Sequence, residues 1–182
     1  MSNLKGTFNT DYTEELFYQA WLPEASPKAV IILAHGLADH SSRYTNLVNH
    51  LLPQGYAVWT FDQRGHGRSP GQRCYINRFS DLTNDLHKFI IMVKEKNHGL
   101  PLFLLGHSLG ALESAALVAE QRSSDISGLI LSGLALDISD NLSKVMLSLA
   151  SIISALTPRL GVQKLACGSI SRDTSVVEDY VK

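Results

Sequence analysis

The stretch Leu102-Phe103-Leu104-Leu105-Gly106-His107-Ser108-Leu109-Gly110 decides the fold of this chain. Its first four residues form a continuous apolar run, which is typical of a strand buried on both faces of a sheet. The segment after Gly110 is rich in alanine and predicts a helix that packs close to that sheet. Glycines on both sides of Ser108 leave room for a sharp turn between the two elements. The pattern therefore predicts a nucleophile elbow, a strand-to-helix turn that presents a reactive serine hydroxyl.

Apolar runs and helical patterns alternate on both sides of this turn. We expect an antiparallel strand first and then four strands of a buried sheet, at residues 16–22, 29–34, 56–61, 102–105 and 126–134. The helices between them are expected from Ser41 to about residue 51, over 82–93 with Ser80 as N-cap and Gly99 as stop signal, and over 111–119. This alternation predicts an α/β fold with a mostly parallel, doubly wound sheet, in which ligands collect at the carboxyl ends of the strands.

The pattern changes after residue 136. Apolar residues at helical spacing over 138–156 predict a helix with no strand behind it, and Thr157-Pro158 ends that helix. The tail 169–182 is polar and still has a helical pattern where the sequence stops. We therefore divide the chain into a core at 1–136 and a second, helical segment at 137–182.

Composition excludes several classes of protein. The 182 residues include 16 lysines and arginines against 17 aspartates and glutamates, a formal net charge of -1, so we expect no nucleic-acid partner. No segment reads as a signal peptide or is apolar for long enough to span a bilayer, so we expect a cytoplasmic protein. Cys74 and Cys167 lack metal-ligand spacing and are too few for a disulfide framework, so we expect unpaired thiols, no metal and no cofactor.

Backbone N–H groups around the elbow can stabilise negative charge. The N–H of Leu109 stands at the start of the helix after Ser108, where the helix dipole is positive. A second donor is expected from the loop after the strand at 29–34, where the N–H of Leu37 follows His35 and Gly36. Together with the supporting residues Gly106, His107 and Gly110, these groups form the candidate site.

No histidine follows Ser108 in the sequence. The fold that uses this elbow places serine, acid and histidine in that order, whereas all seven histidines here lie between His35 and His107. Adjacent residues on a tight turn point in different directions, so we expect His107 to pack and not to act as the base. His35, His40 and His66 are expected to serve loop structure. The chain thus carries a nucleophile without its base.

The loop Asp62-Gln63-Arg64-Gly65-His66-Gly67-Arg68-Ser69 has glycines spaced like part of a phosphate-binding turn. Pro70 stands at the third glycine position and cannot donate an N–H, and no strong helix opens directly from the loop. We therefore do not expect nucleotide binding. The arginines in and after this loop are expected to be solvated surface charges; they are Arg64, Arg68, Arg73 and Arg78.

Three signatures, at 35–44, 62–69 and 106–110, resemble the monoacylglycerol lipase and lysophospholipase branch of the α/β-hydrolases, the serine aminopeptidase S33-like or Hydrolase_4 group. The resemblance implies an α/β-hydrolase fold, Ser108 as nucleophile, the N–H groups of Leu37 and Leu109 as oxyanion hole, and a small acyl ester or lipid as substrate. It also implies that a helical cap begins at Asp137. The helix over 138–156 then meets an acyl chain or rests on a membrane surface as a peripheral contact, and ordinary core packing is an equal alternative.

The sequence departs from that family in two places. Ala38 stands where the family usually has glycine, so a positive φ there would strain the oxyanion loop. The family's last strands, with the triad aspartate and histidine, have no match, which indicates a hydrolase truncated at its C-terminus. We expect a carboxylic-ester hydrolase that works through an acyl-enzyme on Ser108 in its full-length form. The alternative is a catalytically inactive fragment or binding module, and the oligomeric state stays open.

Overall fold

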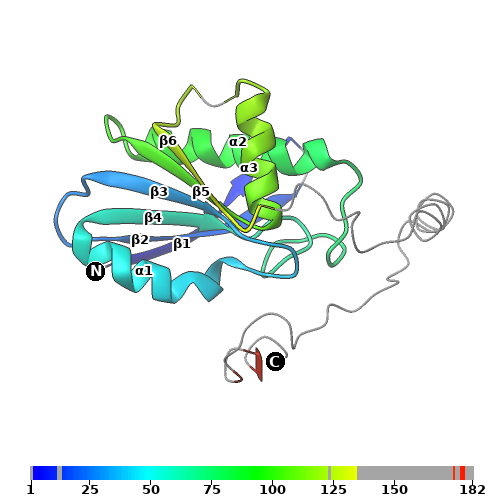
Figure 1. Cartoon of the computed structure of the whole chain (residues 1–182), viewed down its shortest axis with the longest axis horizontal. Helices are drawn as coiled ribbons and strands as arrows, with labels where there is room; N and C mark the ends of the chain where they lie inside the picture. Colours follow the sequence, from blue (N-terminus) through cyan, green and yellow to red (C-terminus); the bar gives the residue numbers. More distant parts are fainter. Residues whose placement is uncertain (1, 12–13, 123, 135–173, 175–176, 179–182) are drawn as a thin grey trace, which may run out of the picture. The chain divides into compact units, whose positions relative to one another are not determined.

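The computed structural model describes residues 2–11, 14–122, 124–134, 174 and 177–178. Backbone contacts divide the chain into the units Met1–Ile138 and Ser139–Lys182. The sheet and the labelled helices belong to the first unit (Figure 1). The predicted helix at 138–156 and Cys167 lie outside the described residues, as does the predicted cap at 137–182 apart from residues 174 and 177–178. None of the described helices is long and apolar enough to cross a membrane.

The described core contains a six-stranded sheet in the order β1-β2-β4-β3-β5-β6. Its strands are β1 Ser2–Asn9, β2 Glu15–Leu22, β3 Ala29–Ala34, β4 Tyr56–Phe61, β5 Leu102–His107 and β6 Gly128–Ser132. β1, β2 and β4 pair antiparallel, whereas β4, β3, β5 and β6 run parallel. This arrangement confirms the predicted α/β class and the antiparallel start.

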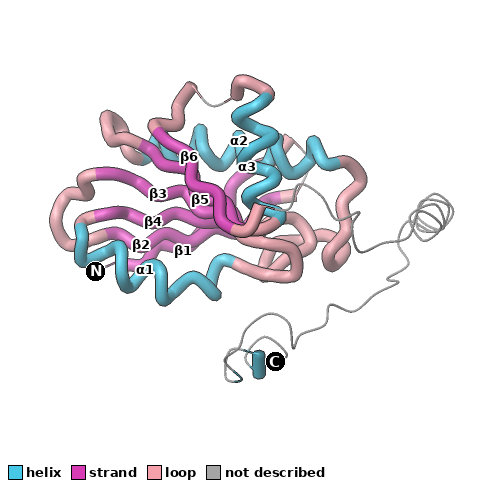
Figure 2. The backbone as a smooth tube through the Cα atoms, in the orientation of Figure 1, coloured by secondary structure: helices cyan, strands magenta, loops and turns pink. Residues whose placement is uncertain are grey.

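Helices cover both faces of the sheet, as Figure 2 shows. They are α1 Thr45–Leu51, α2 Phe79–Lys96 and α3 Leu109–Ala119, with short 3-10 turns at Ser41–Tyr44 and Leu52–Gln54. Apolar side chains of α2 and α3 share one core cluster with alternate residues of β3, such as Val30 and Ile32. The intervening Ile31 packs on the other face with Val48 of α1. All of β3 is therefore buried, as its continuous apolar run predicts.

The structure corrects three details of the predicted elements. β1 was not predicted, because Phe8 is its only buried residue and the strand offers no apolar alternation to detect. The N-cap of α2 is Arg78, not Ser80, and the Asp81 carboxylate accepts a hydrogen bond from the Arg78 N–H at 3.2 Å. The last strand is limited to β6, Gly128–Ser132, which is shorter than the apolar run at 126–134.

Candidate active site

Ser108 occupies the turn between β5 and α3 with a backbone conformation that is rare for a serine. Its φ is 53° and its ψ is −115°. A Cβ on Gly106 would lie 2.6 Å from the Cα of Ala111, and one on Gly110 would lie 2.6 Å from the carbonyl oxygen of His35. Backbone atoms approach both glycines so closely that any side chain would collide with them. The tight turn thus depends on both glycines and holds Ser108 in a strained, partly exposed position.

The loop after β3 lies directly against the nucleophile. A Cβ built on Gly36 would be 3.2 Å from the Cβ of Ser108. Leu37 follows Gly36 with 45% of its surface exposed. Neither the Leu37 N–H nor the Leu109 N–H, which begins α3, donates a hydrogen bond to any residue in the described part of the chain. The fold thus brings together the residues that the sequence predicted for this site.

Ala38, the next residue of this loop, has a φ of 55°. The left-handed region costs an alanine about 1–2 kcal/mol per residue, so Ala38 strains the loop after β3. Asp39 holds the strained segment by accepting hydrogen bonds from the His40 N–H at 2.8 Å and from the Tyr44 hydroxyl at 2.9 Å.

We expect Ala38→Gly to stabilise the protein by about 0.5–1 kcal/mol. The glycine removes the left-handed strain, and the larger entropy of the unfolded glycine chain offsets part of the gain. Urea unfolding at neutral pH measures this change. Ala116→Gly in α3 is the control, since it should lose about 1 kcal/mol. A loss of similar size in both variants would contradict the proposed strain.

His35 is fully buried at the end of β3 and both of its ring nitrogens are engaged. Nδ1 lies 2.7 Å from the carbonyl oxygen of Gly36, and Nε2 accepts a hydrogen bond from the Gln63 N–H at 3.0 Å. The Gln63 side-chain amide in turn donates to the His35 carbonyl at 2.6 Å. Burial lowers the pKa of His35 from 6.5 to about 4. His35 is therefore a neutral structural residue and is not available to deprotonate Ser108.

The low pKa of His35 predicts a loss of stability in acid. The unfolded histidine takes up a proton below pH 6.5, and the folded one does so only near pH 4, so stability is complete above 6.5 and falls between these values. The expected loss is about 3 kcal/mol. Urea unfolding of wild type and His35→Gln across this range isolates the contribution as a difference between the two profiles. The exposed His50 supplies the control His50→Gln, and a wild-type profile parallel to that of His35→Gln would contradict the prediction.

The other histidines near the elbow are also engaged. His107 points its Nδ1 toward the Ser132 hydroxyl at 3.3 Å, and Ser132 accepts the Ser108 N–H through its carbonyl oxygen at 2.9 Å. His66 places Nδ1 2.9 Å from the Arg64 carbonyl oxygen, and burial lowers its pKa. Within residues 2–11, 14–122 and 124–134, no hydrogen bond joins the Ser108 hydroxyl to a histidine.

The loop after β4 is held by hydrogen bonds to its neighbours and within itself. The buried Asp62 carboxylate accepts hydrogen bonds from the Ser41 N–H at 2.7 Å and the Arg68 N–H at 2.8 Å. The N–H groups of Gly65 and Ser69 donate to carbonyl oxygens inside the same loop. Asp62 and Gln63 thus connect the loop after β4 to Ser41 and to His35 at the end of β3. This role was not predicted, because Ser41 and His35 are distant from them in the sequence.

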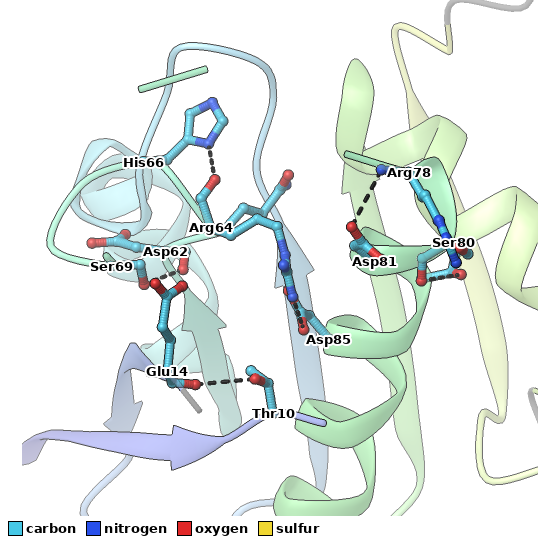
Figure 3. A network of polar contacts seen from close by, with 12 residues as sticks. Thr10, Glu14, Asp62, Arg64, His66, Ser69, Arg78, Ser80, Asp81 and Asp85 are labelled. Atoms are coloured by element: carbon cyan, nitrogen blue, oxygen red, sulfur yellow. Dashed lines mark hydrogen bonds and ion pairs between the residues drawn. The ribbon is translucent and has the colours of Figure 1, made fainter. Parts of the chain in front are cut away.

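The expectation that Arg64 is a solvated charge was wrong. Its guanidinium makes two hydrogen bonds to the carboxylate of Asp85 on α2, at 2.7 and 2.8 Å. Figure 3 shows the two side chains pointing toward each other. The Arg64 side chain is 14% exposed and that of Asp85 is 1% exposed. This buried ion pair fixes the loop after β4 to α2. Charge spacing in the sequence gave no signal for it, because the loop had to be placed on the helix first.

A mostly parallel sheet that presents a serine on a strained strand-to-helix turn defines an α/β-hydrolase. The chain belongs to the family described as serine aminopeptidase, S33 (Hydrolase_4), which it matches over residues 25–182. This membership confirms the resemblance predicted from the three signatures.

Lipases stand among its relatives. The chain is 33% identical over 165 residues to a monoacylglycerol lipase of Mycolicibacterium smegmatis, covering 91% of this chain and 59% of that protein. It is 31% identical over 166 residues to monoglyceride lipase of Homo sapiens, covering 91% and 54%. The crystal structure of a soluble variant of monoglyceride lipase from Saccharomyces cerevisiae, in complex with a substrate analog, matches with a TM-score of 0.77 at 25% identity, over 95% of this chain and 59% of that one. The chain therefore spans between about half and three fifths of the length of these relatives.

Proposed function

We propose that this chain carries the nucleophile and oxyanion hole of a carboxylic-ester hydrolase that acts on monoacylglycerols or lysophospholipids. One observation carries the proposal: Ser108 stands on a strained turn with the unengaged N–H groups of Leu37 and Leu109 on the two segments beside it. Family membership and the lipase relatives support the same reaction class.

The chemistry follows from these groups. The Ser108 oxygen attacks the acyl carbonyl carbon while its proton passes to a general base, and the carbonyl oxygen becomes an oxyanion. The N–H groups of Leu37 and Leu109 donate hydrogen bonds to that oxyanion, and removing one such donor typically costs about 3–4 kcal/mol of barrier. The alcohol then leaves with a proton, which forms an acyl ester on Ser108. Water attacks this ester, releases the acid and restores the hydroxyl.

Apolar side chains beside the nucleophile favour an acyl substrate. Leu37 is 45% exposed on the loop after β3, and Ile130 and Leu131 on β6 are 46% and 38% exposed. The register pairs Ile130 with Leu105 and Leu131 with Gly106, next to the elbow. Ile130 and Leu131 point to opposite faces of the sheet, whereas the exposed Leu37 side chain follows the glycine that lies against Ser108. An exposed apolar side chain beside a reactive group suits the hydrocarbon chain of a lipid ester.

Imidazole supplied as an external base tests this function. With imidazole present, we expect the chain to hydrolyse p-nitrophenyl octanoate faster than Ser108→Ala, which reports the hydrolysis that imidazole causes by itself. The octanoyl ester should be hydrolysed faster than the acetyl ester, because the exposed Leu37 side chain contacts the longer acyl chain. An alanyl p-nitroanilide tests the peptidase activity that the family description names. Ser108-dependent cleavage of the anilide, without cleavage of the esters, would overturn the proposal.

A further inference from the structure

Glu113 is a fully buried acidic residue on α3, the helix that begins at the elbow. Its exposed fraction is 0%, and both of its carboxyl oxygens lack a hydrogen-bond partner among the described residues. An ionised carboxylate without partners is so unfavourable in a protein interior that such a group takes up a proton. The proposed ester chemistry gives this residue no task, so its burial needs a separate explanation.

The charges around Glu113 add to this effect. α3 packs against α2, β3, β5 and β6. From α2, the negative charge of Asp85 acts on Glu113, and Asp81 lies one turn before Asp85. The Arg64 guanidinium donates two hydrogen bonds to Asp85.

The strands behind α3 offer no counter-charge. β3 and β6 contain no ionisable side chain, and β5 contributes only His107, which faces the Ser132 hydroxyl. The described strands that pack against α3 therefore supply no positive charge to Glu113.

We propose that Glu113 is protonated in the folded protein, buried without a hydrogen-bond partner among the described residues, and that its ionisation weakens the core as pH rises. Burial, followed by the charge of Asp85, raises the pKa of Glu113 well above 4.5. The helix that carries Glu113 begins at the turn of Ser108 and packs against α2, so the loss of stability falls on the helix behind the elbow. This inference does not depend on ester hydrolysis.

The sign of the pH effect follows from proton linkage. Above about pH 4.5 the unfolded chain releases the Glu113 proton, whereas the folded chain retains it up to its raised pKa. The folded state thus binds one more proton in this interval, and its stability falls as pH rises. His35 acts in the opposite direction at acidic pH, so the contribution of Glu113 must be measured as a difference between variants.

The test compares urea unfolding of the full 182-residue wild type with that of Glu113→Gln between pH 4.5 and pH 9. We expect the unfolding constant of wild type, divided by that of Glu113→Gln, to rise up to tenfold per pH unit and then to level off at the folded pKa of Glu113. His35 is present in both proteins and cancels. A ratio that stays constant across the range would overturn the proposal.

Three further measurements keep the outcome independent of one variant. Glu113→Leu removes the acid and its polar atoms together, so the wild type should show the same rising ratio against it. Glu120→Gln, near the end of the same helix with an exposed side chain, should give a flat ratio. Infrared spectroscopy of wild type at pH 7 should show a protonated carboxyl band that shifts when glutamate carries 13C. If that band is missing, Glu113 is ionised and the proposal is wrong.

Discussion

Replacing Gly110 with alanine is expected to destabilise the folded core by about 3 kcal/mol or more, at the upper end of what overpacking costs. The new Cβ would lie 2.6 Å from the carbonyl carbon of Ala34 and 2.6 Å from the carbonyl oxygen of His35. These are backbone atoms of the buried end of β3, so no side chain can rotate away to relieve the collision. α3 would have to move off the sheet, and the elbow would move with it. Urea unfolding followed by far-UV circular dichroism measures the loss.

Gly99→Ala separates this collision from the ordinary cost of replacing a glycine. Gly99 has a φ of 78°, but a Cβ there would meet no atom within 4 Å. Its alanine variant should therefore lose only the roughly 1–2 kcal/mol of left-handed strain. Equal losses of stability in Gly99→Ala and Gly110→Ala would contradict this explanation. They would mean that the close approach of α3 to β3 adds no cost to a side chain at position 110.

A polypeptide of this sequence is expected to turn over ester substrates at least about a thousandfold more slowly than a hydrolase with an intact serine–histidine–acid triad, because the oxyanion hole and substrate binding alone remain. All seven histidines precede Ser108 in the sequence. Among them, His35 uses both ring nitrogens in buried contacts, His66 places one against the Arg64 carbonyl oxygen, and His107 faces Ser132.

Steady-state hydrolysis of p-nitrophenyl butyrate measures this turnover, with Ser108→Ala as the matched control. The two proteins should differ little without an added base. Fast hydrolysis by wild type that disappears in Ser108→Ala would mean that one of the seven histidines, or another group, activates the serine after all. In that case the inactive-fragment alternative would fail and the search for the base would return to His40 and the loop after β3.

The elements that carry continuous apolar runs were predictable from the sequence. The strands at 29–34 and 56–61 match β3 and β4 residue for residue, because each is buried on both faces and is bounded by turn residues. The elbow was predictable from its glycines, since the close approach of backbone atoms leaves no alternative residue at 106 and 110. β1 was not predictable, because it contributes one buried side chain and depends on the edge of β2 for its hydrogen bonds.

The polar framework of the site lay beyond sequence reasoning. The hydrogen bond between the Ser41 N–H and Asp62 and the ion pair between Arg64 and Asp85 each join segments that are far apart in the chain. They therefore exist only after the sheet has formed. The burial of Glu113 was not predicted. It lies on the same face of α3 as the buried Gly110 and Leu117, but glutamates in helices are mostly exposed, so its residue type gave no signal. The strain at Ala38, by contrast, followed from comparison with the family pattern.

Mass spectrometry of an acyl adduct tests most directly whether Ser108 is a nucleophile on an oxyanion-binding turn. Incubation with excess p-nitrophenyl octanoate should add one octanoyl group to the chain, because removal of the acyl group by water also needs the base and is slow. Peptide mapping should locate the group on Ser108, and Ser108→Ala should remain unmodified. An adduct on another residue, or none even with imidazole present, would contradict the account.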